Sequence, residues 1–201
     1  MIDNNLQQRQ KVALKIAKYS ILEEFDKNYS KDVQYRLNQA QSYPQLLQQR
    51  ASFVTLKIWW KDLRWCIWSI VATRLLYEDI YINAKNAAFS DPRFSPLEQQ
   101  EVKNLFLEIT VLSPLKSMKF NSVSELLKYL AENKPGLVIK LEWYSATFLP
   151  SVWTELPDPE QFLVHLIYKA GLTPEIFVQN FDKVEIFVYT WEEFWDWFSN
   201  I

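Results

Sequence analysis

The chain contains very little glycine. Only 2 of its 201 residues are glycine, whereas an average share of about 7% would give about 14. The two, Gly136 and Gly171, are 35 positions apart, so the chain has no glycine-rich loop of the kind that binds phosphate. Tryptophan is abundant instead, with 9 residues. The shortage of glycine leaves few positions where the backbone can adopt a positive φ without strain.

Cysteine and histidine are almost absent as well. The single cysteine, Cys66, excludes an internal disulfide and a cysteine-rich zinc site, and it fits a reducing compartment, for which we expect the cytoplasm. The one histidine, His165, stands between Leu163 and Leu166 and is interpreted as a structural or surface residue rather than a ligand or base. There is no Cys-x-x-Cys pair and no Gly-x-Ser-x-Gly elbow, so we expect no metal site and no cofactor.

Strong charge of one sign and long apolar runs are also missing. The net charge is −2 and no run of lysine and arginine reaches five residues, so we expect no nucleic-acid partner. No window holds 18 uncharged apolar residues and no signal peptide is visible, so we expect no membrane partner. The hydrophobic share of 49% is that of a globular protein with one domain, or one domain with a smaller lobe.

Hydrophobic periodicity predicts a mixture of helices and strands. We expect helices over residues 6–25, 75–89, 122–130 and 159–170, with a short one after Pro174. We expect strands over residues 51–58, 63–71, 105–112, 137–141, 144–149 and 184–189.

Short loops join most of the predicted strands, which favours an α+β fold with a mostly antiparallel or mixed β-sheet flanked by helices, in two unequal lobes. Residues 6–194 are expected to form one domain. Within it, residues 27–50 are polar and rich in glutamine and asparagine, which favours an irregular connection. Residues 195–201 are interpreted as a C-terminal tail.

The most informative stretch is Leu63-Arg64-Trp65-Cys66-Ile67-Trp68-Ser69. In a strand, alternate residues share a face, so Arg64, Cys66 and Trp68 are expected to point the same way. A guanidinium beside a thiol lowers the pKa of the thiol, as in reactive cysteines. The alternative is that Cys66 is a small buried hydrophobe, a common role for a free cysteine. Residue chemistry alone favours that alternative.

Glu108 interrupts the apolar run of residues 105–112. A carboxylate in a central strand costs free energy unless it is paired or exposed to solvent. Arg64 and Arg93 are the expected partners. A functional role for Glu108 and a purely structural ion pair both remain open.

Taken together, several segments resemble the AMMECR-type domain family. The motifs are Leu63-Arg64-x-Cys66-Ile67-x-Ser69, Asp91-Pro92-Arg93-Phe94 and Ala146-Thr147-Phe148-Leu149-Pro150-x-Val152-Trp153, with further matches at residues 53–56, 83–89, 108–114, 136–139 and 169–172. The resemblance extends from about Leu6 to Phe194. It implies a two-lobed α+β fold with the cysteine near a cavity.

The resemblance also implies a candidate site and candidate partners. If the protein is an enzyme, we expect its catalytic residues to be Cys66, Arg64 and Glu108. The residues expected to line a binding groove are Ser69, Asp91, Arg93, Phe148 and Pro150. One hypothesis is a binding or accessory component that acts with a Memo-like protein and a radical S-adenosylmethionine protein, or that takes a small-molecule ligand. The other is an enzyme in which Cys66, activated by Arg64, is a nucleophile or redox centre and Glu108 is the acid or base.

The chain departs from the family pattern at positions where glycine is typical. These positions hold Trp59, Trp60, Trp65, Trp68 and Trp143. In turns that require a positive φ, a bulky residue costs about 1–3 kcal/mol. We hypothesise that some of these tryptophans are encoded by UGA codons that the host reads as glycine. UGG codons at Trp65, Trp68 and Trp143 in the coding DNA would contradict this hypothesis.

Overall fold

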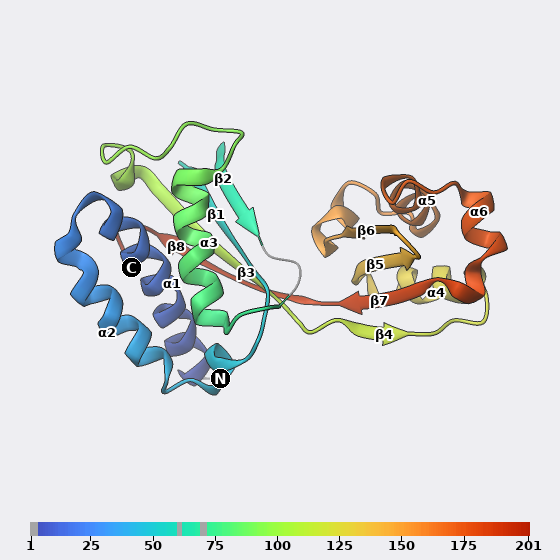
Figure 1. Ribbon diagram of the computed structural model, residues 1–201, viewed down its shortest axis with the longest axis horizontal. Helices are drawn as coiled ribbons and strands as arrows, with labels where there is room; N and C mark the ends of the chain where they lie inside the picture. The colour runs from blue at the N-terminus through green and yellow to red at the C-terminus, as the bar shows by residue number, and fades with distance from the viewer. Residues whose placement is uncertain (1–3, 60–61, 69–71) are drawn as a thin grey trace. The chain divides into compact units, whose positions relative to one another are not determined.

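The computed structural model describes residues 4–59, 62–68 and 72–201. The chain divides into two compact units, one formed by residues 1–112 with 192–201 and the other by residues 113–191. Each unit has its own four-stranded sheet, its own helices and its own hydrophobic core (Figure 1). The predicted α+β fold with two unequal lobes is confirmed.

The sheet of the first unit has the strand order β2-β1-β3-β8. These strands are β1 (Ser52–Ile58), β2 (Asp62–Trp68), β3 (Leu105–Leu112) and β8 (Trp191–Trp197). Strand β1 pairs in the antiparallel sense with β2 and with β3. The prediction for β3 is correct at both ends, whereas the prediction of a tail over residues 195–201 is wrong. Strand β8 continues to Trp197, and Phe198 after it is buried in the core.

Three helices belong to the first unit: α1 (Asn4–Phe25), α2 (Ser30–Ala40) and α3 (Leu76–Ser90). Helices α1 and α3 pack against each other and against the sheet, and α2 packs on α1 (Figure 1). The prediction of an irregular connection over residues 27–50 is therefore wrong. Helix α2 buries only Val33 and Ala40, so its apolar stripe is too narrow to stand out in a sequence rich in amides. Short 3-10 turns at Lys27–Tyr29 and Pro44–Leu47 flank it.

The two faces of this sheet differ in character. One face belongs to the core under α1 and α3, where Val54, Leu56, Leu105, Leu107 and Ile109 are completely buried. The residues that alternate with them point to the other side. We call that side the Cys66 face and define it by Thr55, Lys57, Cys66, Phe106 and Glu108. Two of the three predicted catalytic residues, Cys66 and Glu108, lie on this second face.

The second unit contains a sheet of order β4-β7-β5-β6 and three helices. Its strands are β4 (Lys116–Met118), β5 (Gly136–Leu141), β6 (Tyr144–Phe148) and β7 (Glu185–Tyr189). Its helices are α4 (Val123–Asn133), α5 (Pro159–Lys169) and α6 (Pro174–Gln179). Strand β7 pairs in the antiparallel sense with β4 and with β5, and β5 pairs in the same sense with β6.

Local sequence signals position the helix ends of this unit. Ser122 Oγ accepts a hydrogen bond from the Glu125 amide at 3.2 Å, and Asp158 Oδ1 accepts one from the Glu160 amide at 2.8 Å. Gly171 has a φ of 82°, the left-handed conformation that glycine adopts freely after a helix. These capping residues act as the sequence predicts. Across the described part of the chain, no helix is both long and apolar enough to cross a membrane.

The tryptophans predicted to strain the turns behave differently from one another. Trp59, directly after β1, has a φ of 52°, in the left-handed region. Trp143 lies in the two-residue loop between the paired Leu141 and Tyr144, but there the positive φ of 54° belongs to Glu142. The predicted strain is therefore present at Trp59 and absent at Trp143. Trp60 lies outside the described residues.

Replacing Trp59 by glycine should raise the free energy of unfolding by about 1 kcal/mol. A side chain in the left-handed region costs about 1–2 kcal/mol, and the extra freedom of glycine in the unfolded chain offsets part of the gain. Urea denaturation measures the difference. Trp143→Gly is the matched control, because it also removes an exposed indole from a turn but relieves no positive φ. Equal stabilisation by both substitutions would contradict the explanation.

Candidate functional site

The main chain of Cys66 is held by two charged residues from the segment after α3. The Cys66 amide donates to Asp91 Oδ2 at 3.0 Å, and Arg93 Nη2 donates to the Cys66 carbonyl at 2.9 Å. Asp91 and Arg93 also bind each other, with Arg93 Nε at 3.0 Å from Oδ1 and Nη2 at 2.8 Å from Oδ2. We call this arrangement the Asp91–Arg93 clamp.

The clamp occupies the free edge of the sheet. Strand β2 is an edge strand, with β1 on one side only, and an edge strand leaves main-chain groups unpaired. At Cys66 the carboxylate and the guanidinium take the places of the carbonyl and amide of a missing neighbour. The predicted binding residues Asp91 and Arg93 are thus brought to Cys66, but their groups are engaged with the main chain and with each other.

The electrostatics of the clamp follow from burial and pairing. The Asp91 side chain is completely buried, while that of Arg93 is 48% exposed. The hydrogen bonds from the Arg93 guanidinium and from the Cys66 and Arg93 amides hold the pKa of Asp91 well below its usual range. Asp91 in turn raises the pKa of Arg93. Both groups stay charged over the whole physiological pH range.

The thiol of Cys66 lies on the Cys66 face beside its cross-strand partner Thr55, with Sγ and Oγ1 at 3.2 Å. Burial raises the pKa of the thiol, and the hydrogen bond with Thr55 and the charge of Arg93 only partly oppose that effect. Nearby Asp91 and Glu108 raise it further. The guanidinium of Arg93 thus acts in the expected direction, but desolvation is the largest effect and leaves the pKa of the thiol above its ordinary value.

Arg64 does not take the position that strand alternation predicts. Leu56 pairs with Trp65 and Lys57 pairs with Leu63, so Arg64 is the extra residue of a β-bulge. Its guanidinium lies 3.4 Å from Glu101 Oε1 and 3.2 Å from Ser95 Oγ, over the Trp65 ring. Arg64 therefore pairs with the segment that precedes β3.

Trp65 lies on the core side of the sheet and is completely buried. Its Nε1 donates to the Ser95 carbonyl at 2.8 Å, which satisfies the one polar group of the indole. The indole thus fills the core and not the space beside the thiol. The side chain of Trp68 and the whole of Ser69 lie outside the part of the molecule that the structure describes.

Glu108 forms an ion pair with Lys57, and Lys57 Nζ lies 2.7 Å from Oε2. The predicted partners Arg64 and Arg93 are wrong for Glu108, since they pair with Glu101 and Asp91. Thr55 stands opposite Cys66 on β2 and opposite Glu108 on β3, so it separates the thiol from the carboxylate. The three proposed catalytic residues therefore do not form one constellation.

The ion pair borders a hollow of about 480 Å³ on the Cys66 face. Its lining consists of Lys57, Phe106, Glu108, Trp195 and Trp197. Sequence reasoning missed Lys57 and both tryptophans. The alternation of Trp195 and Trp197 with the core residues Phe194 and Phe198 is the signal that predicts a strand with one buried face and one aromatic face.

The other predicted binding residues, Phe148 and Pro150, belong to the second unit. The Phe148 ring packs edge-on against Phe162 at 5.3 Å and lies 4.9 Å from Lys169 Nζ. Pro150 is buried at the start of the 3-10 turn Pro150–Thr154. Phe148 thus packs against the hydrophobic core of that unit.

A buried polar network was also missed by sequence reasoning. Asp79 Oδ2 accepts hydrogen bonds from the Ser52 amide at 2.9 Å, from Ser52 Oγ at 2.7 Å and from Asn83 Nδ2 at 3.0 Å. Asn83 also donates to the Ser52 carbonyl at 3.0 Å. This network fastens α3 to the start of β1, a structural role for the asparagine of the 83–89 segment.

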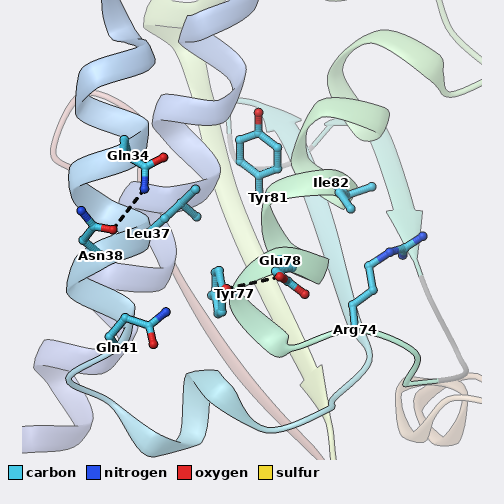
Figure 2. A pocket seen from close by; sticks show the side chains of 9 residues that line it. All are labelled: Gln34, Leu37, Asn38, Gln41, Arg74, Tyr77, Glu78, Tyr81 and Ile82. Atoms are coloured by element: carbon cyan, nitrogen blue, oxygen red, sulfur yellow. Dashed lines mark hydrogen bonds between the residues drawn. The ribbon is translucent and has the colours of Figure 1, made fainter.

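A second hollow, of about 350 Å³, lies between α2 and α3 (Figure 2). Its polar groups largely satisfy one another. Gln34 Nε2 donates to Asn38 Oδ1 at 3.1 Å, and the Tyr77 hydroxyl donates to Glu78 Oε1 at 3.2 Å (Figure 2). Arg74 at its rim is 3.5 Å from Asp79. Several of the polar groups that line this hollow are therefore already engaged.

Metal ligands do not gather in the described part of the chain, where no three histidine, cysteine or carboxylate side chains are placed to hold an ion. His165 is exposed on α5, in agreement with its interpretation as a surface residue.

Comparison with known proteins matches residues 14–194 to the AMMECR1 family. Protein NEQ441 of Nanoarchaeum equitans is 32% identical over 180 residues, covering 89% of this chain and 93% of that protein. Protein MJ0810 of Methanocaldococcus jannaschii is 33% identical over 147 residues, covering 72% of this chain and 73% of that protein. The crystal structure of the uncharacterized protein PH0010 from Pyrococcus horikoshii superposes with a TM-score of 0.70 at 25% identity, over 94% of this chain and 92% of that one.

Replacing Asp91 by asparagine should lower the free energy of unfolding at pH 7 by about 2 kcal/mol, because Arg93 and the Cys66 amide lose their charged partner. The pKa of Asp91 is lower in the folded state than in the unfolded chain. Its contribution is thus complete above the unfolded pKa of about 4 and is lost as the pH falls through the folded pKa. Wild type and variant should converge in stability as the pH is lowered.

Urea denaturation between about pH 7 and pH 2 measures this convergence. Asp26→Asn is the control, because Asp26 is exposed and only caps a 3-10 turn, where asparagine serves about as well. A stability difference for Asp91→Asn that is constant down to pH 2 would rule out the proposed role of the ionised carboxylate.

Proposed function

This chain belongs to the AMMECR1 family, and we propose that it is a binding or accessory component whose Cys66 face receives its ligand or partner. The observation that carries the proposal is the state of Cys66. Its main chain is held by the Asp91–Arg93 clamp, and its thiol is hydrogen-bonded to Thr55. Burial raises the pKa of that thiol. A thiol in that state is a structural group rather than a nucleophile.

The enzyme alternative needs a thiolate with a base beside it. The basic residue nearest in sequence, Arg64, is paired with Glu101 at 3.4 Å. Glu108 is paired with Lys57 at 2.7 Å and is separated from Cys66 by Thr55. Because each candidate group already has another partner, cysteine-dependent catalysis is the second choice.

Positive evidence for binding comes from the charges and rings of the Cys66 face. The side chains of Lys57 and Glu108 are only 25% and 15% exposed, so their ion pair is partly desolvated. Desolvating an ion pair costs free energy, and apolar residues at the same positions would stabilise the fold without that cost. Next to them, Trp195 leaves 57% of its surface exposed. Exposed aromatic surface beside half-buried charge is typical of a binding site.

The family resemblance suggests the partners. We propose a Memo-like protein and a radical S-adenosylmethionine protein, acting with this chain in the cytoplasm, where a single free cysteine stays reduced. In this proposal the partners supply the reaction and this domain supplies recognition.

A tagged chain, purified from its native host, should therefore capture the Memo-like and radical S-adenosylmethionine proteins. Cys66→Ser should capture them as well as wild type, since serine keeps the hydrogen bond to Thr55 and the main-chain clamp. Trp195→Ala, which removes an exposed indole that lines the hollow on the Cys66 face, should reduce their recovery several-fold as measured by quantitative mass spectrometry. Lys134→Ala, an exposed charge of the second unit, is the control and should have no effect.

The reactivity of the Cys66 thiol distinguishes the accessory role from the cysteine-dependent enzyme. The rate of iodoacetamide alkylation plotted against pH should give a Cys66 pKa above the free value of about 8.5. A pKa below that value with rapid selective alkylation, together with loss of activity in Cys66→Ser, would establish the enzyme and refute the accessory role.

A further inference from the structure

The hollow on the Cys66 face combines three aromatic rings with one ion pair. Phe106 on β3 packs against Trp195 of β8 at 5.1 Å with an interplanar angle of 37°, and against Trp197 at 5.5 Å with an angle of 83°. Phe106 is 8% exposed, so it anchors the two indoles from below. Strands β3 and β8 are hydrogen-bonded neighbours, which makes the aromatic wall part of the sheet itself.

The polar end of the hollow is the Lys57–Glu108 pair. Within the described part of the chain, Lys57 is the only hydrogen-bond partner of Glu108, and the contact uses Oε2. The second carboxylate oxygen and the remaining ammonium protons are therefore available to a ligand. The hollow offers acceptors and a donor side by side, next to flat apolar surface.

The charge balance decides between ligand classes. An aromatic wall with a lone carboxylate would favour a permanent cation, but here Lys57 already neutralises Glu108 at 2.7 Å. A neutral planar ring fits better, because it stacks on the indoles without disturbing the pair. Such a ring needs neighbouring donors for the carboxylate and an acceptor for the ammonium.

Guanine has this arrangement on its Watson–Crick edge. Its ring N–H and exocyclic amine are adjacent donors, which suit a carboxylate, and its carbonyl oxygen is an acceptor, which suits a lysine. Adenine and cytosine present a different order of donors and acceptors. The hollow of about 480 Å³ has room for a purine and its sugar.

We propose that the hollow lined by Lys57, Phe106, Glu108, Trp195 and Trp197 is a binding site for a guanine nucleobase, presented as a nucleoside or nucleotide. The assignment rests on the proposed function, since it names a ligand class for the same sheet face. It requires no chemistry at Cys66 and no strand of nucleic acid.

Isothermal titration calorimetry of the full chain with guanosine, inosine and adenosine tests the assignment. Guanosine should bind saturably with a dissociation constant below about 1 mM. Inosine, which lacks the exocyclic amine, and adenosine should bind at least about fivefold more weakly. Saturable binding of tetramethylammonium at this hollow, or equal affinities for the three nucleosides, would overturn the proposal.

Variants locate the site. Trp195→Ala and Glu108→Gln should each weaken guanosine binding about tenfold, through lost stacking and lost pairing respectively. Trp143→Ala is the control, because that indole is exposed on the second unit and far from the described lining in sequence. Circular dichroism of each variant verifies that it is folded. Unchanged affinity in folded Trp195→Ala or Glu108→Gln would refute the site.

The outcome is separable from the proposed function. If the wild-type chain captures its protein partners but binds no guanosine, the ligand assignment is wrong and the accessory role stands. If Cys66 proves to be a catalytic thiolate, the accessory role is wrong whatever the calorimetric titration shows. The guanosine site is then tested by the affinities of the Trp195→Ala and Glu108→Gln variants alone.

Discussion

The candidate site depends on the pairing of Asp91 with Arg93 at the edge of strand β2. A buried carboxylate without a partner would cost several kcal/mol, and the guanidinium beside it removes most of that cost. The same two side chains then bind the amide and carbonyl of Cys66. An edge that would otherwise be open to strand addition is closed at this residue, and the orientation of β2 is set.

The consequence for chemistry is that Cys66 is positioned but not activated. The clamp binds its main chain, whereas burial and two nearby carboxylates raise the pKa of its thiol against the opposing effect of the Thr55 hydrogen bond. The groups with free hydrogen-bonding capacity are Lys57 on β1 and Glu108 on β3, beside the exposed indole of Trp195. One face of the sheet therefore provides stability through Trp65 and the core aliphatic residues, and the other carries the groups that we propose for recognition.

Most strands and helices follow from the sequence because their signals are local. Strand β3 was predicted at both ends, and the caps at Ser122 and Asp158 act as their residue types suggest. Helix α2 and strand β8 were missed because amide-rich and acidic aromatic compositions hide a narrow apolar stripe. The alternation of β8 is present in the sequence, but the elements on which α2 and β8 pack, α1 and β3, are not revealed by any local pattern.

For the candidate site too, some features follow from the sequence and others only from the tertiary structure. The sequence by itself determined the family and the α+β class, and it singled out the Arg64–Cys66 and Asp91–Arg93 segments, since these rest on residue types and their order. Only the tertiary structure decided which charges meet. A β-bulge turns Arg64 toward Glu101, and strand register places Lys57 beside Glu108. Ion pairing and desolvation depend on distances of a few ångströms between residues far apart in the chain, and chain folding alone sets those distances.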